Sequence, residues 1–82
     1  MEQIARTSKQ IGEALRRERR RIKMSQSVLS DKTNLRQQTI SSVENGDPGT
    51  QLRTLLEIIT ALDLELLIRS RSEAPSSFEN IF

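Results

Sequence analysis

A short polar segment, from Arg36 to Ser42, carries the most evident binding chemistry of this 82-residue chain. Gln37 and Gln38 each offer a donor and an acceptor, and such an amide can bond in a bidentate manner to the edge of adenine. Arg36 adds a guanidinium group, which only donates and which suits guanine or a phosphate. The segment therefore predicts a surface that binds through hydrogen bonds.

The residue types on which most catalytic and metal chemistry depends are missing. The sequence has no Cys and no His, which excludes disulfides, the usual zinc sites, thiol nucleophiles and imidazole acid–base chemistry. Ser, Asp and Glu occur, but no nucleophile has a recognisable base and no glycine-rich phosphate loop is present. We therefore expect a protein that is not an enzyme and that holds no metal or cofactor.

A helix over residues 37–45 is expected to present the polar segment. Ile40 and Val43 lie three positions apart, as buried side chains of a helix do, so the two glutamines and Ser42 must project outward. Gly46 follows, as a glycine at the end of a helix should. The outward side chains lie near the N-terminal end of a helix sized for the major groove of DNA.

The first helix is expected over residues 8–23, with Ser8 as its N-cap. Three apolar side chains at helical spacing would form its buried face, namely Ile11, Leu15 and Ile22. The opposite side of this helix is basic. We expect only some of these charges to face a partner, because they encircle the helix.

A second helix is expected over residues 26–33, with Ser25 as its N-cap and with Val28 and Leu29 buried. Asn34 follows at a position that suits a left-handed turn residue, since Asn tolerates a positive φ. The connection to the next helix is therefore predicted to be tight.

A fourth helix is expected over residues 51–62, after an N-cap at Thr50 and the turn sequence Asp-Pro-Gly. Its apolar residues repeat at steps of three and four, namely Leu52, Leu55, Leu56, Ile59 and Leu62. The fold class is thus mainly α, with four to five helices.

Beyond Asp63 the apolar residues alternate, which favours an extended β-strand with Leu64, Leu66 and Ile68 on one face. A lone strand needs a partner, and no second strand is visible in the sequence, so we expect strands to pair across a dimer. A continuation of the fourth helix over residues 63–68 is the alternative, because Leu and Glu favour helices.

Residues 72–82 are rich in Ser, Glu, Pro and Asn, and we expect them to form a flexible tail after one domain over residues 8–71. Phe78, Ile81 and Phe82 interrupt its polar composition, and both aromatic residues of the protein lie here. They are candidate anchors for a partner. The alternative is that they fold back on their own domain.

Charge divides the chain into two halves. Residues 1–46 hold ten Lys and Arg against five Asp and Glu, which gives +5, whereas residues 47–82 hold three against six, which gives −3. The first half suits a polyanion, although charge runs are also common on solvated helix faces. No apolar run approaches the roughly 18 residues of a membrane span and no signal peptide is visible, so we expect a cytoplasmic protein without membrane contact.

Residues 8–62 resemble the XRE, or lambda-repressor-like, helix-turn-helix family. Three motifs carry the resemblance: S-Q at the second helix, L-x-x-x-x-N-L at the turn and Q-Q-T-I-S-x-V-E-N-G over the third helix. The family implies contacts to bases or nearby phosphates from Arg36, Gln37, Gln38, Thr39 and Ser42, and phosphate contacts from Gln26 and Asn45. It also implies an ion pair between Arg19 and Glu44 that braces the third helix.

Three residues depart from the family pattern. Arg36 stands where a small hydroxyl residue usually caps the third helix, and Thr33 stands where an apolar residue is usual. Asn34 replaces the usual glycine of the turn. Arg36 adds a potential phosphate or guanine contact, while Thr33 is expected to weaken packing.

The strand and tail after the fourth helix resemble the HipB-type antitoxins, which pair strands across a dimer and bind a HipA-like kinase toxin. This resemblance implies a homodimer on a palindromic double-stranded DNA operator, repression of its own toxin–antitoxin operon and inhibition of the toxin. A stand-alone repressor, of the phage or restriction-modification controller type, is the main alternative. A protein-interaction adaptor that has lost DNA binding is another.

Overall fold

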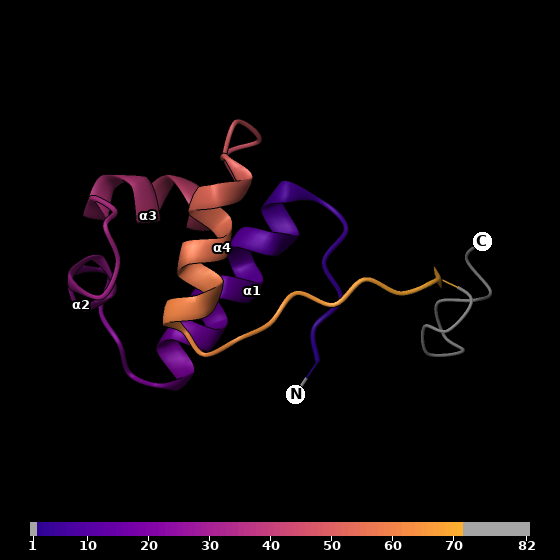
Figure 1. The fold of residues 1–82 in the computed structure, drawn as a ribbon, viewed down its shortest axis with the longest axis horizontal. Helices are drawn as coiled ribbons and strands as arrows, with labels where there is room; N and C mark the ends of the chain where they lie inside the picture. The colour runs from indigo at the N-terminus through magenta and orange to yellow at the C-terminus, as the bar shows by residue number, and fades with distance from the viewer. Residues whose placement is uncertain (1, 72–82) are drawn as a thin grey trace.

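Four helices make up the computed structural model, which describes residues 2–71: α1 (Ser8–Arg21), α2 (Gln26–Asp31), α3 (Gln37–Glu44) and α4 (Leu52–Ala61). In Figure 1, α2 and α3 lie together on one side and α4 lies in front of α1. The core is formed by leucine, isoleucine and valine side chains from all four helices and from the residue that follows α4: Leu15, Leu29, Ile40, Val43, Ile58, Ile59 and Leu62. The prediction of a mainly α fold with four to five helices is confirmed, with four helices among residues 2–71.

The N-cap of helix α1 lies one residue before the predicted one, and the helix ends earlier than expected. Thr7, and not Ser8, is the N-cap, because its side chain accepts a hydrogen bond from the backbone N–H of Gln10 at 3.0 Å. At the other end Lys23 adopts a positive φ of 58°, which turns the chain away from the helix. Ile22 therefore lies past the last turn and is 41% exposed, so its predicted burial is wrong.

Helix α2 buries only one of the two side chains that we expected. Leu29 is fully buried, whereas Val28 is 43% exposed, because neighbouring residues of a helix point about 100° apart. Ser25 is the N-cap, as predicted, and accepts a hydrogen bond from the backbone N–H of Val28 at 3.1 Å. The helix ends at Asp31, two residues earlier than expected.

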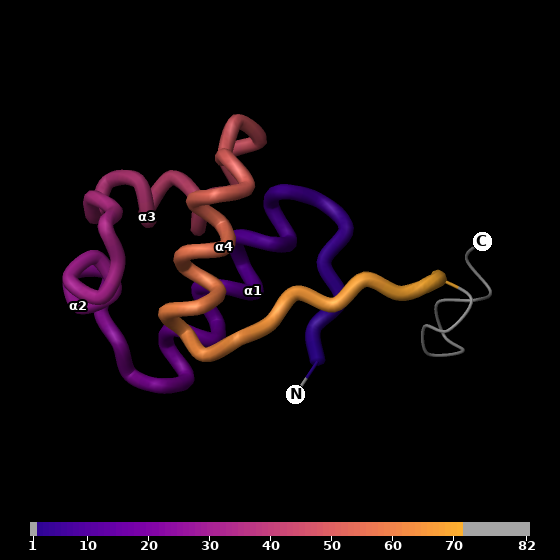
Figure 2. Tube along the Cα trace, viewed as in Figure 1, coloured from indigo at the N-terminus to yellow at the C-terminus, as the bar shows by residue number. Residues whose placement is uncertain are grey.

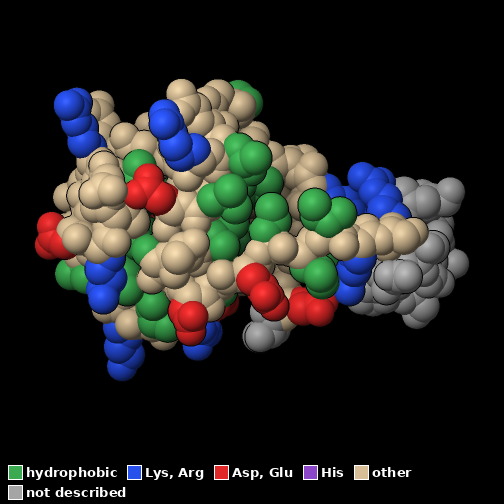
Figure 3. Space-filling view, in the orientation of Figure 1, with side chains coloured by type: hydrophobic (Ala, Val, Ile, Leu, Met, Phe, Trp, Pro, Cys, Tyr) green, Lys and Arg blue, Asp and Glu red, His purple; other side chains and the backbone are tan. Residues whose placement is uncertain are grey.

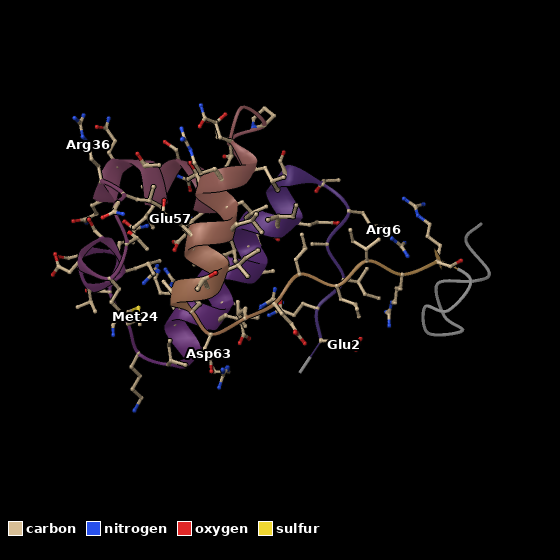
Figure 4. All side chains as sticks on the ribbon, in the orientation of Figure 1. Glu2, Arg6, Met24, Arg36, Glu57 and Asp63 are labelled. Atoms are coloured by element: carbon tan, nitrogen blue, oxygen red, sulfur yellow. The ribbon has the colours of Figure 1, made fainter. Side chains whose placement is uncertain are left out.

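Side chains, and not a left-handed residue, hold the turn between α2 and α3. Among the described non-glycine residues only Lys23 and Asp63 have a positive φ, so the prediction for Asn34 is wrong. The backbone N–H of Asn34 donates to Oε1 of Glu57 in α4 at 3.2 Å, and Figure 4 shows Glu57 on the side of α4 toward this turn. The hydroxyl oxygen of Thr33 accepts a hydrogen bond from the backbone N–H of Leu35 at 3.2 Å. Thr33 thus contributes a hydrogen bond at a position where an apolar side chain would contribute packing.

Helix α4 is one residue shorter at each end than the pattern predicted. Gln51 is its N-cap and forms no side-chain capping bond, while Thr50 donates to the carbonyl oxygen of Asp47 at 2.9 Å. The cap prediction for Thr50 is therefore wrong. Ile58, which the periodicity missed, is fully buried, whereas Leu52 and Leu56 are 63% and 41% exposed.

The chain after α4 is extended but forms no strand within residues 2–71. Asp63 has a φ of 58° and ends the helix, so the alternative of a longer fourth helix is wrong. The predicted β-strand is not present either, because the described part of this single chain supplies no second strand to bond with its backbone. Leu64 packs against the core, while Leu66 and Ile68 are 54% and 89% exposed.

The trace of this extended segment crosses that of the N-terminal residues in Figure 2. Nη1 of Arg69 lies 3.1 Å from Oε1 of Glu2, which joins the two segments by an ion pair. The predicted anchors Phe78, Ile81 and Phe82 and the predicted tail lie outside the described residues.

Candidate DNA interface

Helix α3 is held against α1 by a close approach of the two backbones. A Cβ atom at Gly12 of α1 would lie 2.5 Å from the carbonyl oxygen of Val43 and 2.6 Å from that of Glu44. Only glycine has room here. A second contact follows at Gly46, whose φ is 86° and which lies against the Cα atom of Lys9. The last turn of α3 therefore has a fixed position on α1.

A buried carboxylate at the end of α3 ties three helices together. Nε of Arg19 donates to Oε2 of Glu44 at 2.6 Å and Nη2 donates to Oε1 at 2.9 Å, so the ion pair that the family implies is present and bidentate. Gln26 of α2 donates from Nε2 to the same Oε1 at 3.1 Å. Within residues 2–71 no buried side-chain nitrogen or oxygen lacks a partner, so this network is fully satisfied.

The network changes the acidity of its members. Burial by itself would raise the pKa of the Glu44 carboxyl group, but the hydrogen bonds from Arg19 and Gln26 outweigh burial and hold this pKa below its ordinary value. The hydrogen bond to Glu44 raises the pKa of Arg19 above its ordinary value, against the lowering effect of burial. Both groups are therefore charged at neutral pH.

The side chains predicted to read bases lie on the outer edge of α3. Arg36, Gln37, Gln38 and Ser42 are exposed, whereas Thr39 is half-buried. Arg36 is the N-cap of the helix and makes no side-chain capping bond, and Figure 4 shows it at the outer end of α3, pointing away from the domain. The edge thus offers donors and acceptors on a helix whose inner face is buried at Ile40 and Val43.

The two predicted phosphate ligands already have partners within the domain. Gln26 donates to Glu44, as described above, and Asn45 accepts a hydrogen bond at its Oδ1 from Nη2 of Arg16 at 2.8 Å. Nε of Arg16 also lies 3.5 Å from Oε1 of Glu44. The sequence did not single out Arg16, although its place one helical turn before Arg19 was a signal that both could reach Glu44.

Other binding chemistry is not evident in the described residues. Within residues 2–71 no group of three or more acidic, His or Cys side chains is placed to hold a metal ion. None of the helices among these residues combines the length and the hydropathy of a membrane span. The candidate site is the outer edge of α3, because it is there that exposed polar side chains lie on a helix with a buried inner face.

Comparisons with known proteins agree with this geometry. A family model described as helix-turn-helix matches residues 15–68, and the chain belongs to this family. No curated protein matches the chain.

Solved structures of HipB share the fold. A chain from a "HipB-O4 20mer complex" superposes with a TM-score of 0.80 at 29% identity, over 84% of this chain and 97% of that one. A chain from a "HipA-HipB-O2-O3 complex" gives a TM-score of 0.79 at 29% identity, over 84% and 97%. A chain from a "HipB-O1-O2 complex" gives 0.79 at 29%, over 84% and 100%. The described residues thus form a helix-turn-helix DNA-binding domain with a HipB-like fold.

Proposed function

We propose that this protein is a sequence-specific transcriptional repressor that inserts α3 into the major groove of its operator. Gln37, Gln38 and Ser42 contact base edges, Thr39 contacts a base or a nearby phosphate, and Arg36 contacts a phosphate or a guanine. The observation that carries this proposal is an exposed polar edge on a helix whose last residue is locked to α1 and α2 through buried Glu44.

Selection from a randomised duplex library, followed by gel shifts at two salt concentrations, tests the proposal. We expect one sequence family to be enriched and its affinity to fall steeply with salt, because phosphate contacts release counterions. An adaptor without DNA binding would enrich no sequence. A protein that binds every duplex equally would contradict base reading by α3.

The repressor is proposed to act as a homodimer on a palindromic operator. Apolar side chains lie along α4 and continue onto the extended segment after it, as Figure 3 shows; Leu66, Leu67 and Ile68 are each more than half exposed. Pairing of this segment with its copy would supply the missing backbone hydrogen bonds. The two recognition helices would then read half-sites about 34 Å apart, or a multiple of that distance. A footprint over one isolated half-site would contradict the dimer.

A second proposed function is that of an antitoxin that represses its own operon and inhibits a HipA-like kinase toxin. It is favoured by the likeness to HipB in a complex that also contains HipA, over 84% of the chain. Phe78, Ile81 and Phe82 are the proposed toxin anchors, together with the acidic second half of the chain.

Co-expression with the product of a neighbouring kinase-like gene tests the antitoxin role. We expect the full chain to restore growth, and a chain that lacks residues 76–82 to bind the toxin more weakly while it keeps its operator affinity. Equal loss of both activities would contradict this division of labour. A stand-alone repressor would not restore growth at all.

A further inference from the structure

Asn45 lies on the same side of α3 as the proposed reading edge. Gln38, Ser42 and Asn45 are spaced by four and three residues, so they form one exposed row that ends at the last turn. A recognition helix contacts bases mainly through its N-terminal part. The end of this row is therefore placed toward the DNA backbone, where an uncharged amide can donate to a phosphate.

We propose that Arg16 is a positioning residue, which holds the carboxamide of Asn45 with its NH₂ group directed toward a DNA phosphate. This proposal rests on the proposed DNA binding. Its basis is the hydrogen bond of 2.8 Å from Nη2 of Arg16 to Oδ1 of Asn45.

The chemistry of the two groups fixes the direction of the amide. A guanidinium group only donates, so it binds the oxygen and not the nitrogen of a carboxamide. The Nδ2 group of Asn45 then points away from Arg16, and it makes no hydrogen bond within residues 2–71. A phosphate only accepts, so the orientation that Arg16 imposes is the one that a phosphate needs. The opposite orientation would present an acceptor to an anion.

Arg16 is itself held in place. Its Nε atom lies 3.5 Å from Oε1 of Glu44, the carboxylate that also binds Arg19 and Gln26, and its side chain is 34% exposed. The Asn45 amide is thus linked to the same buried centre that fixes the end of α3. This pre-organisation reduces the entropy that an exposed Asn would lose on binding.

Direct binding of Arg16 to a phosphate is the competing explanation, and a double-mutant cycle separates the two. The variants are Arg16→Ala, Asn45→Ala and their combination in the full chain, and the probe is the duplex recovered by the library selection. Arg17→Ala is the matched control for the lost charge, because Arg17 points to Gln3 of the N-terminal segment, where Nη1 donates to Oε1 at 2.7 Å.

We expect Arg16→Ala and Asn45→Ala each to weaken binding about fivefold, the cost of one hydrogen bond. The combined variant is expected to lose no more than either single variant, because both remove the same contact. The salt dependence of Arg16→Ala should match that of Arg17→Ala. Additive losses, or a salt slope lower by about 1 than that of the control, would mean a direct phosphate contact and would overturn the proposal.

A measurement without DNA tests the contact between Arg16 and Asn45 separately from DNA binding. In the NMR spectrum of the folded full chain, the two Nδ2 protons of Asn45 should move toward random-coil positions in Arg16→Ala but not in Arg17→Ala. Unchanged signals in a folded Arg16→Ala variant would overturn the positioning role. If the unmodified chain enriches no duplex, the proposed function fails, and this proposal fails with it.

Discussion

Arg19 and Glu44 form a bidentate ion pair, with Nε to Oε2 at 2.6 Å and Nη2 to Oε1 at 2.9 Å, which joins α1 to the last residue of α3. Both side chains are buried. The guanidinium group of Arg19 also donates from Nη1 to the carbonyl oxygen of Met24 at 2.7 Å. One side chain thus fixes both α3 and the loop before α2.

Removal of one member of this pair should be strongly destabilising. Arg19→Met removes the two hydrogen bonds and the opposite charge that Arg19 gives to the buried carboxylate of Glu44. We therefore expect the free energy of unfolding to fall by about 3 kcal/mol. The double variant with Glu44→Met should recover most of this loss, because no buried charge then remains. Urea denaturation measures the free energy of unfolding of the single and the double variant, and Arg17→Met is the control at an exposed position. A single variant as stable as the control would contradict a structural role for the pair.

Acid should remove the contribution of Glu44. Its pKa in the folded state lies below the ordinary value of about 4.3, so its stabilisation is complete above that pH and is lost as the pH falls through the folded-state pKa. We expect Glu44→Gln to be less stable than the unmodified chain at pH 7, and the difference to shrink below pH about 4. Urea denaturation at a series of pH values checks this. A difference that is constant down to pH about 2.5 would contradict the assignment.

Gly12→Ala should separate α1 from α3. Alanine favours helices over glycine by about 1 kcal/mol, but here its Cβ atom would lie 2.5 Å and 2.6 Å from two backbone oxygens, which cannot move without α3. We expect a net destabilisation of about 2 kcal/mol and weaker DNA binding, since overpacking outweighs propensity. Glu13→Ala, at the next and exposed position, is the control for helix propensity. A stabilised Gly12→Ala variant would refute the close approach.

The sequence predicted the helices better than it predicted which of their side chains are buried and how the turns between them are formed. Spacing identified four helices and the inward side chains Ile40 and Val43, because a strong apolar period survives local variation. It failed at Val28 and Ile58, since a short run of neighbouring apolar residues does not reveal which one faces the core. It also failed at Asn34, whose turn depends on Glu57, 23 residues away.

The sequence predicted those features of the candidate site that depend on α3 alone. It did not predict the contacts that depend on the packing of α3 against other helices. The outer edge of α3 follows from its buried face, so Gln37, Gln38 and Ser42 are exposed as expected. The contacts of Arg16 with Glu44 and Asn45 depend on how α1 crosses α3. The local sequence pattern of either helix does not show how the two helices cross.

Dimerisation should depend on the exposed apolar side chains after α4. Leu66→Lys combined with Ile68→Lys is expected to give a monomer, because two charges cannot be buried in a paired strand without a large cost. Leu64 is left unchanged because it packs against the core. Sedimentation velocity measures the mass, and Glu65→Lys, at an exposed neighbouring position, is the control. An unchanged dimer mass in the double variant would rule out this interface.

The most direct test of base reading by α3 compares two affinities of one variant. Gln38→Ala should lose about 1–3 kcal/mol of binding to the selected duplex and almost none to a scrambled duplex of equal length, because base contacts specify and phosphate contacts do not. Gln10→Ala, which removes an exposed amide from α1, is the control. Equal affinities of Gln38→Ala and the unmodified chain for the selected duplex, or equal losses on both duplexes, would contradict the claim that this edge reads the operator.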